Sequence, residues 1–101
     1  MKLVYCPCKY NDEAREIARE LLRKKLIACA NVFPITSLYG WKKKKREQGE
    51  TVLLCKTTAA RAKKVVAEIK KMHSYECPAI IVIDAKANKE FEKWVSKSTS
   101  R

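Results

Sequence analysis

The sequence predicts an α+β fold made of two β-α-β halves, and three observations support this. The apolar segment Leu3–Cys6 is echoed later by Val52–Cys55. Each copy precedes apolar residues at the i, i+3, i+4, i+7 spacing of an amphipathic helix, and a further β-rich segment follows each helix. With 47% apolar and 34% charged residues and only two glycines, the composition is that of a compact globular protein. We therefore expect one domain over residues 1–101.

The first half is expected to begin with a strand at Leu3–Cys6, which Pro7 should end because proline cannot donate a ladder hydrogen bond. Asn11 or Asp12 can then cap a helix. The buried stripe of that helix is predicted to consist of Ala14, Ile17, Ala18, Leu21 and Leu22.

A long β-hairpin should follow. Leu26–Phe33 and Ile35–Trp41 are β-rich and separated only by Pro34, and Thr51–Thr57 is the returning strand. Fully extended, residues 27–41 would span about 50 Å, which exceeds the ~35 Å width of a compact domain of this size. Pro34 is expected to supply a bend or bulge. The remaining overhang leaves strand edges that a neighbouring subunit would most simply cover, so we expect an oligomer.

The second half repeats the pattern. Thr58 should cap a second helix, a loop around Pro78 should lead to a buried strand at Ala79–Ile83, and Phe91 and Trp94 belong to a final helix. The second helix should bury Ala62, Val65, Val66, Ile69 and Met72. Right-handed crossovers then give a ferredoxin-like β-α-β-β-α-β sheet with both helices on one face and the last helix as an appendage.

The composition and the absence of several motifs exclude some classes of function. No apolar run approaches the roughly 18 residues of a membrane span, and the N-terminus lacks the apolar stretch of a signal peptide, so the cytoplasm is the expected location. Glycine-rich phosphate loops and nucleophile–base constellations are absent from the sequence. We therefore expect a binding protein and not an enzyme.

Soft metal ligands gather in two segments of the chain. Cys6 and Cys8 end the first predicted strand, and Met72, His73 and Cys77 follow or end the second helix. Thiolate, thioether and imidazole groups suit Cu(I) or zinc. We expect the two segments at opposite ends of one chain, so that they would meet only across a subunit boundary. The alternative is that the histidine serves only as a hydrogen-bonding group.

The net charge of +12 includes the run Lys42–Arg46, flanked by Tyr39 and Trp41. Cations and aromatic rings at a hairpin tip could bind nucleic acid. The sequence favours a plainer interpretation, in which a hairpin tip must be polar and cationic tips resist edge pairing. Nucleic acid is therefore not an expected partner.

A third group of side chains could hold a small anionic or planar ligand near the strand ends. Packing in a subunit interface is the alternative for its aromatic rings. The group consists of Tyr39, Trp41, Lys56, His73 and Tyr75.

Four segments carry a family resemblance: LIACAN at 26–31, SLYGW at 37–41, LCKTT at 54–58 and HSYECPA at 73–79. Together they make the chain, from about residue 3 to residue 97, resemble the CutA divalent-cation-tolerance family. The resemblance implies a ferredoxin-like protomer in a tight homotrimer, related in shape to the PII nitrogen-regulatory proteins, with long hairpins exchanged between neighbours. It also implies a cytoplasmic role in tolerance of copper and other divalent metals, without an established catalytic reaction.

In copper-binding relatives the proposed ligands are a cysteine that ends the first strand and two adjacent histidines. Cys6 and His73 match two of these positions, and Met72 replaces the other histidine. Lys42 and Lys43 stand where the family often has Glu and Gly, which makes this hairpin tip unusually basic. Ser74 likewise replaces the usual proline after the histidine.

The resemblance thus favours a trimeric protein that binds copper or another divalent or soft metal through Cys6, Met72 and His73. The alternative is a PII-like regulatory or scaffold module whose inter-subunit clefts bind a small anion near Lys56.

Overall fold

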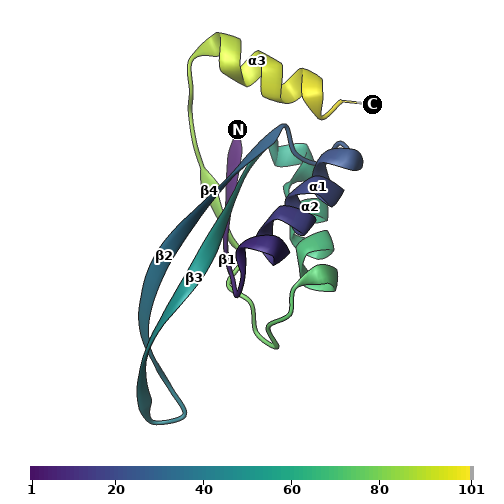
Figure 1. The fold of residues 1–101 in the computed structure, drawn as a ribbon. Coiled ribbons are helices and arrows are strands. Elements are labelled where there is room, and N and C mark those ends of the chain that lie inside the picture. Colours follow the sequence, from purple (N-terminus) through teal and green to yellow (C-terminus); the bar gives the residue numbers. More distant parts are fainter. Residues whose placement is uncertain (101) are drawn as a thin grey trace.

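The computed structural model describes residues 1–100 as a twisted antiparallel sheet with two helices on one face and a third helix across one end (Figure 1). The strands lie in the order β2-β3-β1-β4. This arrangement confirms the predicted α+β, ferredoxin-like class. In chain order the elements are β1 Lys2–Cys8, α1 Asn11–Arg23, β2 Cys29–Trp41, β3 Lys44–Thr57, α2 Ala59–Met72, β4 Ile81–Asp84 and α3 Lys89–Ser98.

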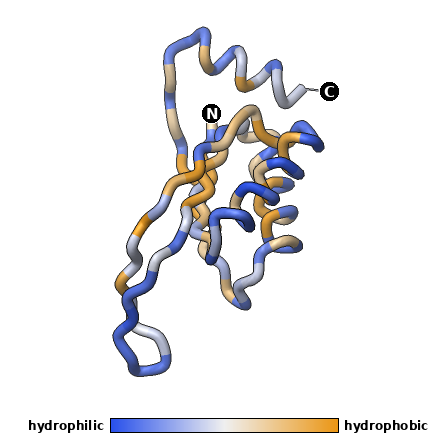
Figure 2. The backbone as a smooth tube through the Cα atoms, in the orientation of Figure 1, coloured by the Kyte–Doolittle hydropathy of each residue, from blue (hydrophilic) through white to orange (hydrophobic). Residues whose placement is uncertain are grey.

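The core lies between the sheet and helices α1 and α2. Alternate residues of β1 point into it, and each helix buries most of the stripe that the sequence predicted. The exceptions are Leu22 of α1, which is 43% exposed, and two residues of α2: Met72 is 36% exposed and Val66 is only half-buried. Figure 2 shows the apolar residues concentrated on the sheet and the inner helix faces. The wholly buried members of this core include Val4, Cys6, Cys8, Ala14, Leu21, Leu53, Cys55, Val65 and Ile69.

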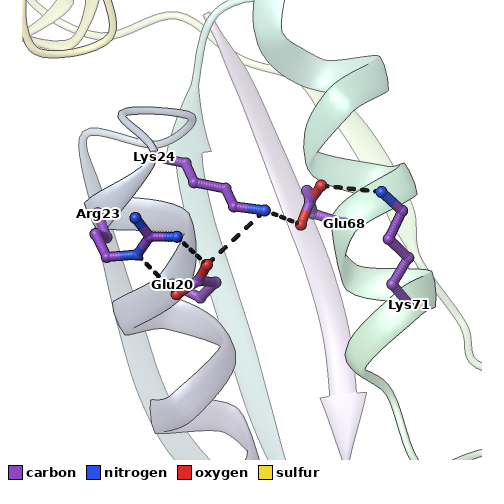
Figure 3. A network of polar contacts seen from close by, with 5 residues as sticks. All are labelled: Glu20, Arg23, Lys24, Glu68 and Lys71. Carbon is purple, nitrogen blue, oxygen red and sulfur yellow. Dashed lines mark hydrogen bonds and ion pairs between the residues drawn. The ribbon is translucent and has the colours of Figure 1, made fainter.

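Ion pairs join the outer surfaces of the two helices (Figure 3). Lys24, just after α1, places its Nζ 2.7 Å from a carboxylate oxygen of Glu68 on α2, and the same carboxylate also pairs with Lys71. Hydrogen bonding to Lys24 holds the pKa of Glu68 below its usual value. Glu20 and Arg23 extend the network along α1. These pairs lie at the surface, where solvent screens them, so the apolar core contributes more to stability.

The predicted long hairpin is present, but the expected bulge at Pro34 is not. β2 and β3 pair without interruption from Cys29 opposite Lys56 to Trp41 opposite Lys44. β2 is an edge strand, so Pro34 can lack a donor without loss of a ladder bond. β1 accompanies β3 only over residues 51–57. The remaining two-stranded ribbon projects beyond the sheet, as the overhang argument predicted (Figure 1).

Pro7 does not end the first strand, contrary to prediction. β1 continues to Cys8, and Pro7 lies opposite Val52 of β3. On its other side β1 pairs with β4 only as far as Tyr5. Pro7 therefore stands where one side of the strand has no partner, and its missing N–H leaves the ladder intact.

The C-terminal strand also differs from the prediction. β4 spans Ile81–Asp84 and all four residues are exposed, although the sequence predicted a buried strand at 79–83. β4 forms the second edge of the sheet, so no further strand of the chain lies beside it. Its apolar side chains are therefore exposed in the single chain. Of the described helices, none has both the length and the apolar content needed to cross a membrane.

Candidate metal-binding site and aromatic hollow

Two thiols and an imidazole meet at one end of the sheet. Cys6 and Cys8 lie two residues apart on β1 and share its helix-covered face, and His73 follows α2 directly. The Sγ atoms of both cysteines and a ring nitrogen of His73 all lie within 4.8 Å of one another. The expectation that these groups sit at opposite ends of a chain is therefore wrong. Since β3 is antiparallel to β1 and α2 runs back along β3, α2 ends beside the end of β1.

The two thiols are wholly buried, and His73 is nearly so. Hydrogen bonding to Cys8, together with burial, raises the pKa of the Cys6 thiol far above its ordinary value. Cys6 is thus a neutral thiol at pH 7. A metal ion that binds here must displace the thiol proton, which favours soft ions that form strong bonds to sulfur.

Both ring nitrogens of His73 already have partners. Nδ1 accepts a hydrogen bond from the Tyr75 backbone N–H at 3.1 Å. Nε2 lies 2.9 Å from the Pro7 carbonyl oxygen, so it must carry the proton and donate it to that oxygen. These bonds fix the plane of the ring beside the thiols. Coordination through Nε2 would replace the bond to Pro7 and release a proton.

Glu13 holds the segments around this site together. Its carboxylate accepts the Lys9 backbone N–H at 3.0 Å and the Ser74 backbone N–H at 2.8 Å. Burial alone would raise the pKa of Glu13, but hydrogen bonds from Ser74 and Lys9 outweigh burial and lower it. Glu13 is not among the site residues predicted from the sequence. The available signal was an acidic residue in the first turn of α1, where carboxylates commonly accept backbone N–H groups.

The other predicted soft ligands, Met72 and Cys77, are exposed to solvent, unlike the buried thiols of this cluster. Met72 is the last residue of α2 and is 36% exposed, whereas both clustered thiols are buried. Cys77 is exposed, although it follows His73 by only four residues. Cys55, on β3, is wholly buried, and burial raises its pKa to about 12.

Three aromatic side chains form a second feature next to the thiols. Tyr39, Trp41 and Tyr75, together with Glu76 and Cys77, line a cavity of about 200 Å³, here called the aromatic hollow. The Tyr75 hydroxyl donates to a Glu50 carboxylate oxygen at 2.6 Å and lies 3.3 Å from the Gln48 amide nitrogen, which donates to it. β3 therefore fixes one wall of the hollow. The His73 and Tyr75 rings lie 4.8 Å apart, so the two features adjoin.

The structure thus brings Tyr39, Trp41 and Tyr75 together as the sequence suggested, but it places Lys56 elsewhere. Lys56 extends its Nζ to 5.7 Å from the ring of Phe91 on α3. No cation lines the hollow among the residues that the structure describes. A small anion would therefore find no partner charge there within one chain.

Comparisons with known proteins agree with this fold. The family model described as CutA1 divalent ion tolerance protein matches residues 2–98. The divalent-cation tolerance proteins CutA of Archaeoglobus fulgidus and Thermotoga maritima are each 38% identical, over 96 and 99 residues. These alignments cover 94% of this chain and 94% of the first relative, and 97% of this chain and 98% of the second.

Solved structures agree equally well. The A. fulgidus structure, described as a periplasmic divalent cation tolerance protein CutA, gives a TM-score of 0.95 at 36% identity and covers 99% of this chain and 100% of its own. CutA1 from Pyrococcus horikoshii gives 0.94 at 31% identity and covers both chains completely. A PII-like protein CutA from Nostoc gives 0.92 at 26% identity, with coverage of 99% and 98%. The chain therefore belongs to the CutA1 divalent ion tolerance protein family.

Proposed function

We propose that this protein is a binding protein, without catalytic activity, that acts in divalent-cation tolerance by holding copper as Cu(I), or another soft metal, at Cys6, Cys8 and His73. The observation that carries this proposal is that the three ligand atoms converge to within 4.8 Å in one chain. Family membership supports the role in tolerance of divalent cations.

The donor set favours a soft ion. Two sulfur ligands and one imidazole nitrogen suit the low coordination number of Cu(I), whereas structural zinc sites almost always use four protein ligands. Met72 lies next to His73 in the chain, and we propose it as an additional thioether ligand that copper would accept more readily than zinc. The buried surroundings of Cys6 and Cys8 would keep water away from the bound ion.

We propose the cytoplasm as the location because this site needs reduced thiols. All five cysteines are free, and the reducing cytoplasm keeps thiols in that state. The A. fulgidus relative is described as periplasmic, so the location of this chain should be measured directly.

A homotrimer is the second part of the proposal. Both edge strands carry exposed apolar residues, among them Leu38 of β2 at 70% and Ile81 of β4 at 48%. Open strand edges with apolar side chains are normally covered in native proteins. Three copies that exchange their projecting hairpins would cover both edges, in the manner that the PII-like relationship suggests.

Replacing Leu38 with lysine is expected to dissociate the trimer because a charged side chain would have to lose its hydration in an apolar interface. The substitution preserves the hairpin, since Leu38 lies opposite Glu47 and a Lys–Glu cross-strand pair is favourable. Light scattering after size-exclusion chromatography measures the mass. Leu38→Met, which conserves volume, serves as the control and should remain trimeric. An unchanged mass for Leu38→Lys would place the interface elsewhere.

The metal proposal is tested by titrating the reduced protein with Cu(I) against a competing chelator. We expect about one Cu(I) per chain and a loss of at least about 100-fold in affinity for Cys6→Ser, because a first ligand is removed. Cys77→Ser is the matched control, since that thiol is exposed and lies outside the cluster. Equal affinities for wild type and Cys6→Ser would refute the site.

A further inference from the structure

The turn at the end of the hairpin has an unusual composition. Lys42 and Lys43 form its two central residues, with φ angles of 51° and 63°. Two-residue hairpin turns with positive φ at both positions strongly favour Asn-Gly, because longer side chains are strained there. A tip that only had to be polar would be better served by Asn and Gly. Turn geometry therefore does not account for the two lysines, and strained residues of this kind often mark functional positions.

The strand register places cations and aromatic rings on one face of the hairpin. Lys44 lies directly opposite Trp41, and Arg46 lies directly opposite Tyr39. Residues opposite each other in a pair, and residues two apart along a strand, share a face of the sheet. Two rings on β2 and two cations on β3 thus lie side by side, each ring opposite a cation, on the face that leads from the aromatic hollow to the turn.

These groups are available for binding within the chain. All residues of Lys42–Arg46, here called the cationic tip, are exposed, and Tyr39 and Trp41 are 39% and 48% exposed. Within residues 1–100, no carboxylate forms an ion pair with the cationic tip, in contrast to the paired Lys24 and Lys71 of Figure 3. Figure 2 shows the tip as a hydrophilic loop that projects away from both helices of the core.

We propose that the cationic tip and the aromatic hollow together bind single-stranded nucleic acid. Phosphates would contact Lys42–Arg46, and unpaired bases would stack on Tyr39 and Trp41, with one base entering the hollow beside Tyr75. Single strands expose the faces of their bases, whereas a duplex hides them. The carboxylate side chains of an acidic polypeptide offer no aromatic ring that could stack on Tyr39 and Trp41. This activity uses none of the proposed metal ligands, so it can be tested separately from metal binding.

Fluorescence anisotropy with a labelled oligothymidine of about 16 nucleotides measures this binding. If the tip contacts three to five phosphates, affinity should fall roughly 20- to 130-fold between about 50 and 200 mM salt, because counterions are released from the strand. Absence of binding at the lower salt concentration, or an affinity independent of salt, would overturn the proposal.

A variant of the cationic tip tests whether its charges are needed for binding while the fold is preserved. Lys42→Asn and Lys43→Gly give the turn its preferred residues, and glutamine replaces Lys44, Lys45 and Arg46. We expect this variant to fold at least as stably as wild type and to lose most of its affinity and salt dependence. The control removes the same number of charges from helices α2 and α3, where glutamine replaces the exposed Lys63, Lys64, Lys70, Lys93 and Lys97. An equal loss in the control would mean that net charge alone attracts the strand, and would overturn the proposal.

Ring stacking is tested with the two tryptophans, which are almost equally exposed. Trp41→Gln should weaken binding about 5- to 150-fold, whereas Trp94→Gln on α3, with Trp94 at 47% exposure, should leave it unchanged. In a Trp94→Phe background, the oligonucleotide should quench the emission of Trp41 without any change at the tip. Unchanged emission, or equal affinity for duplex DNA or polyglutamate of matched length, would overturn the assignment to single strands.

Discussion

Replacing Cys8 with serine is expected to weaken Cu(I) binding as severely as Cys6→Ser, by at least about 100-fold. Cys8 is wholly buried and belongs to the same cluster of ligand atoms, so its loss would leave one thiolate and one imidazole. Met72→Leu should reduce affinity by less than about tenfold, because the half-exposed thioether is at most an additional ligand to a site that retains both thiols. Competition titration with a Cu(I) chelator measures all three affinities.

The free energy of unfolding of each metal-free variant provides the control. A serine hydroxyl in a buried position can lack a partner, which destabilises the protein independently of metal. Cys8→Ala avoids this effect and should show the same loss of affinity. A large loss for Met72→Leu together with a small loss for Cys8→Ala would favour the set Cys6, Met72 and His73 over the buried cluster.

The sequence predicted the ligand set Cys6, Met72 and His73, whereas the structure groups Cys6 and His73 with Cys8. This difference shows how far the site could be predicted from the sequence. Residue types and the match to CutA motifs identified Cys6 and His73. The directions of β1, β3 and α2 bring His73 to the same end of the sheet as Cys8. The predicted ferredoxin-like topology already contained these directions, so the expectation of opposite ends was an error in applying it. The distance between the ligand atoms, in contrast, depends on side-chain packing that no sequence pattern provides. The meeting of Tyr39 and Tyr75 depends equally on the hairpin and the loop after α2 reaching the same end of the molecule.

The fold was predicted more completely than the site because its signals are local. The repeated strand–helix pattern and the helical spacing of apolar residues were enough for the ferredoxin-like topology. Pro7 does not end its strand and Pro34 makes no bulge, for one physical reason. Proline weakens a strand only where its N–H would be paired, and Pro7 and Pro34 each lie where one side of the strand has no partner. The exposure of β4 reflects its edge position, and the proposed trimer would bury it as the sequence expected.

Leu53→Ala is expected to cost about 2–5 kcal/mol of unfolding free energy, the range for removing a fully buried leucine side chain from a core. Leu53 is wholly buried on β3 and lies directly opposite Cys6 of β1. The substitution would therefore leave a cavity beside the proposed metal ligands. Leu22→Ala removes the same atoms from a residue that is 43% exposed and should cost less than about 1 kcal/mol.

Denaturant unfolding followed by circular dichroism compares the two variants. Protein concentrations must be equal, because unfolding of an oligomer depends on concentration. If both leucines proved equally important, Leu22 would have to be covered by a neighbouring subunit, which would extend the interface onto α1. If neither mattered, the face of the sheet that carries Cys6 and Cys8 would not be the closed, water-free core that the metal site requires.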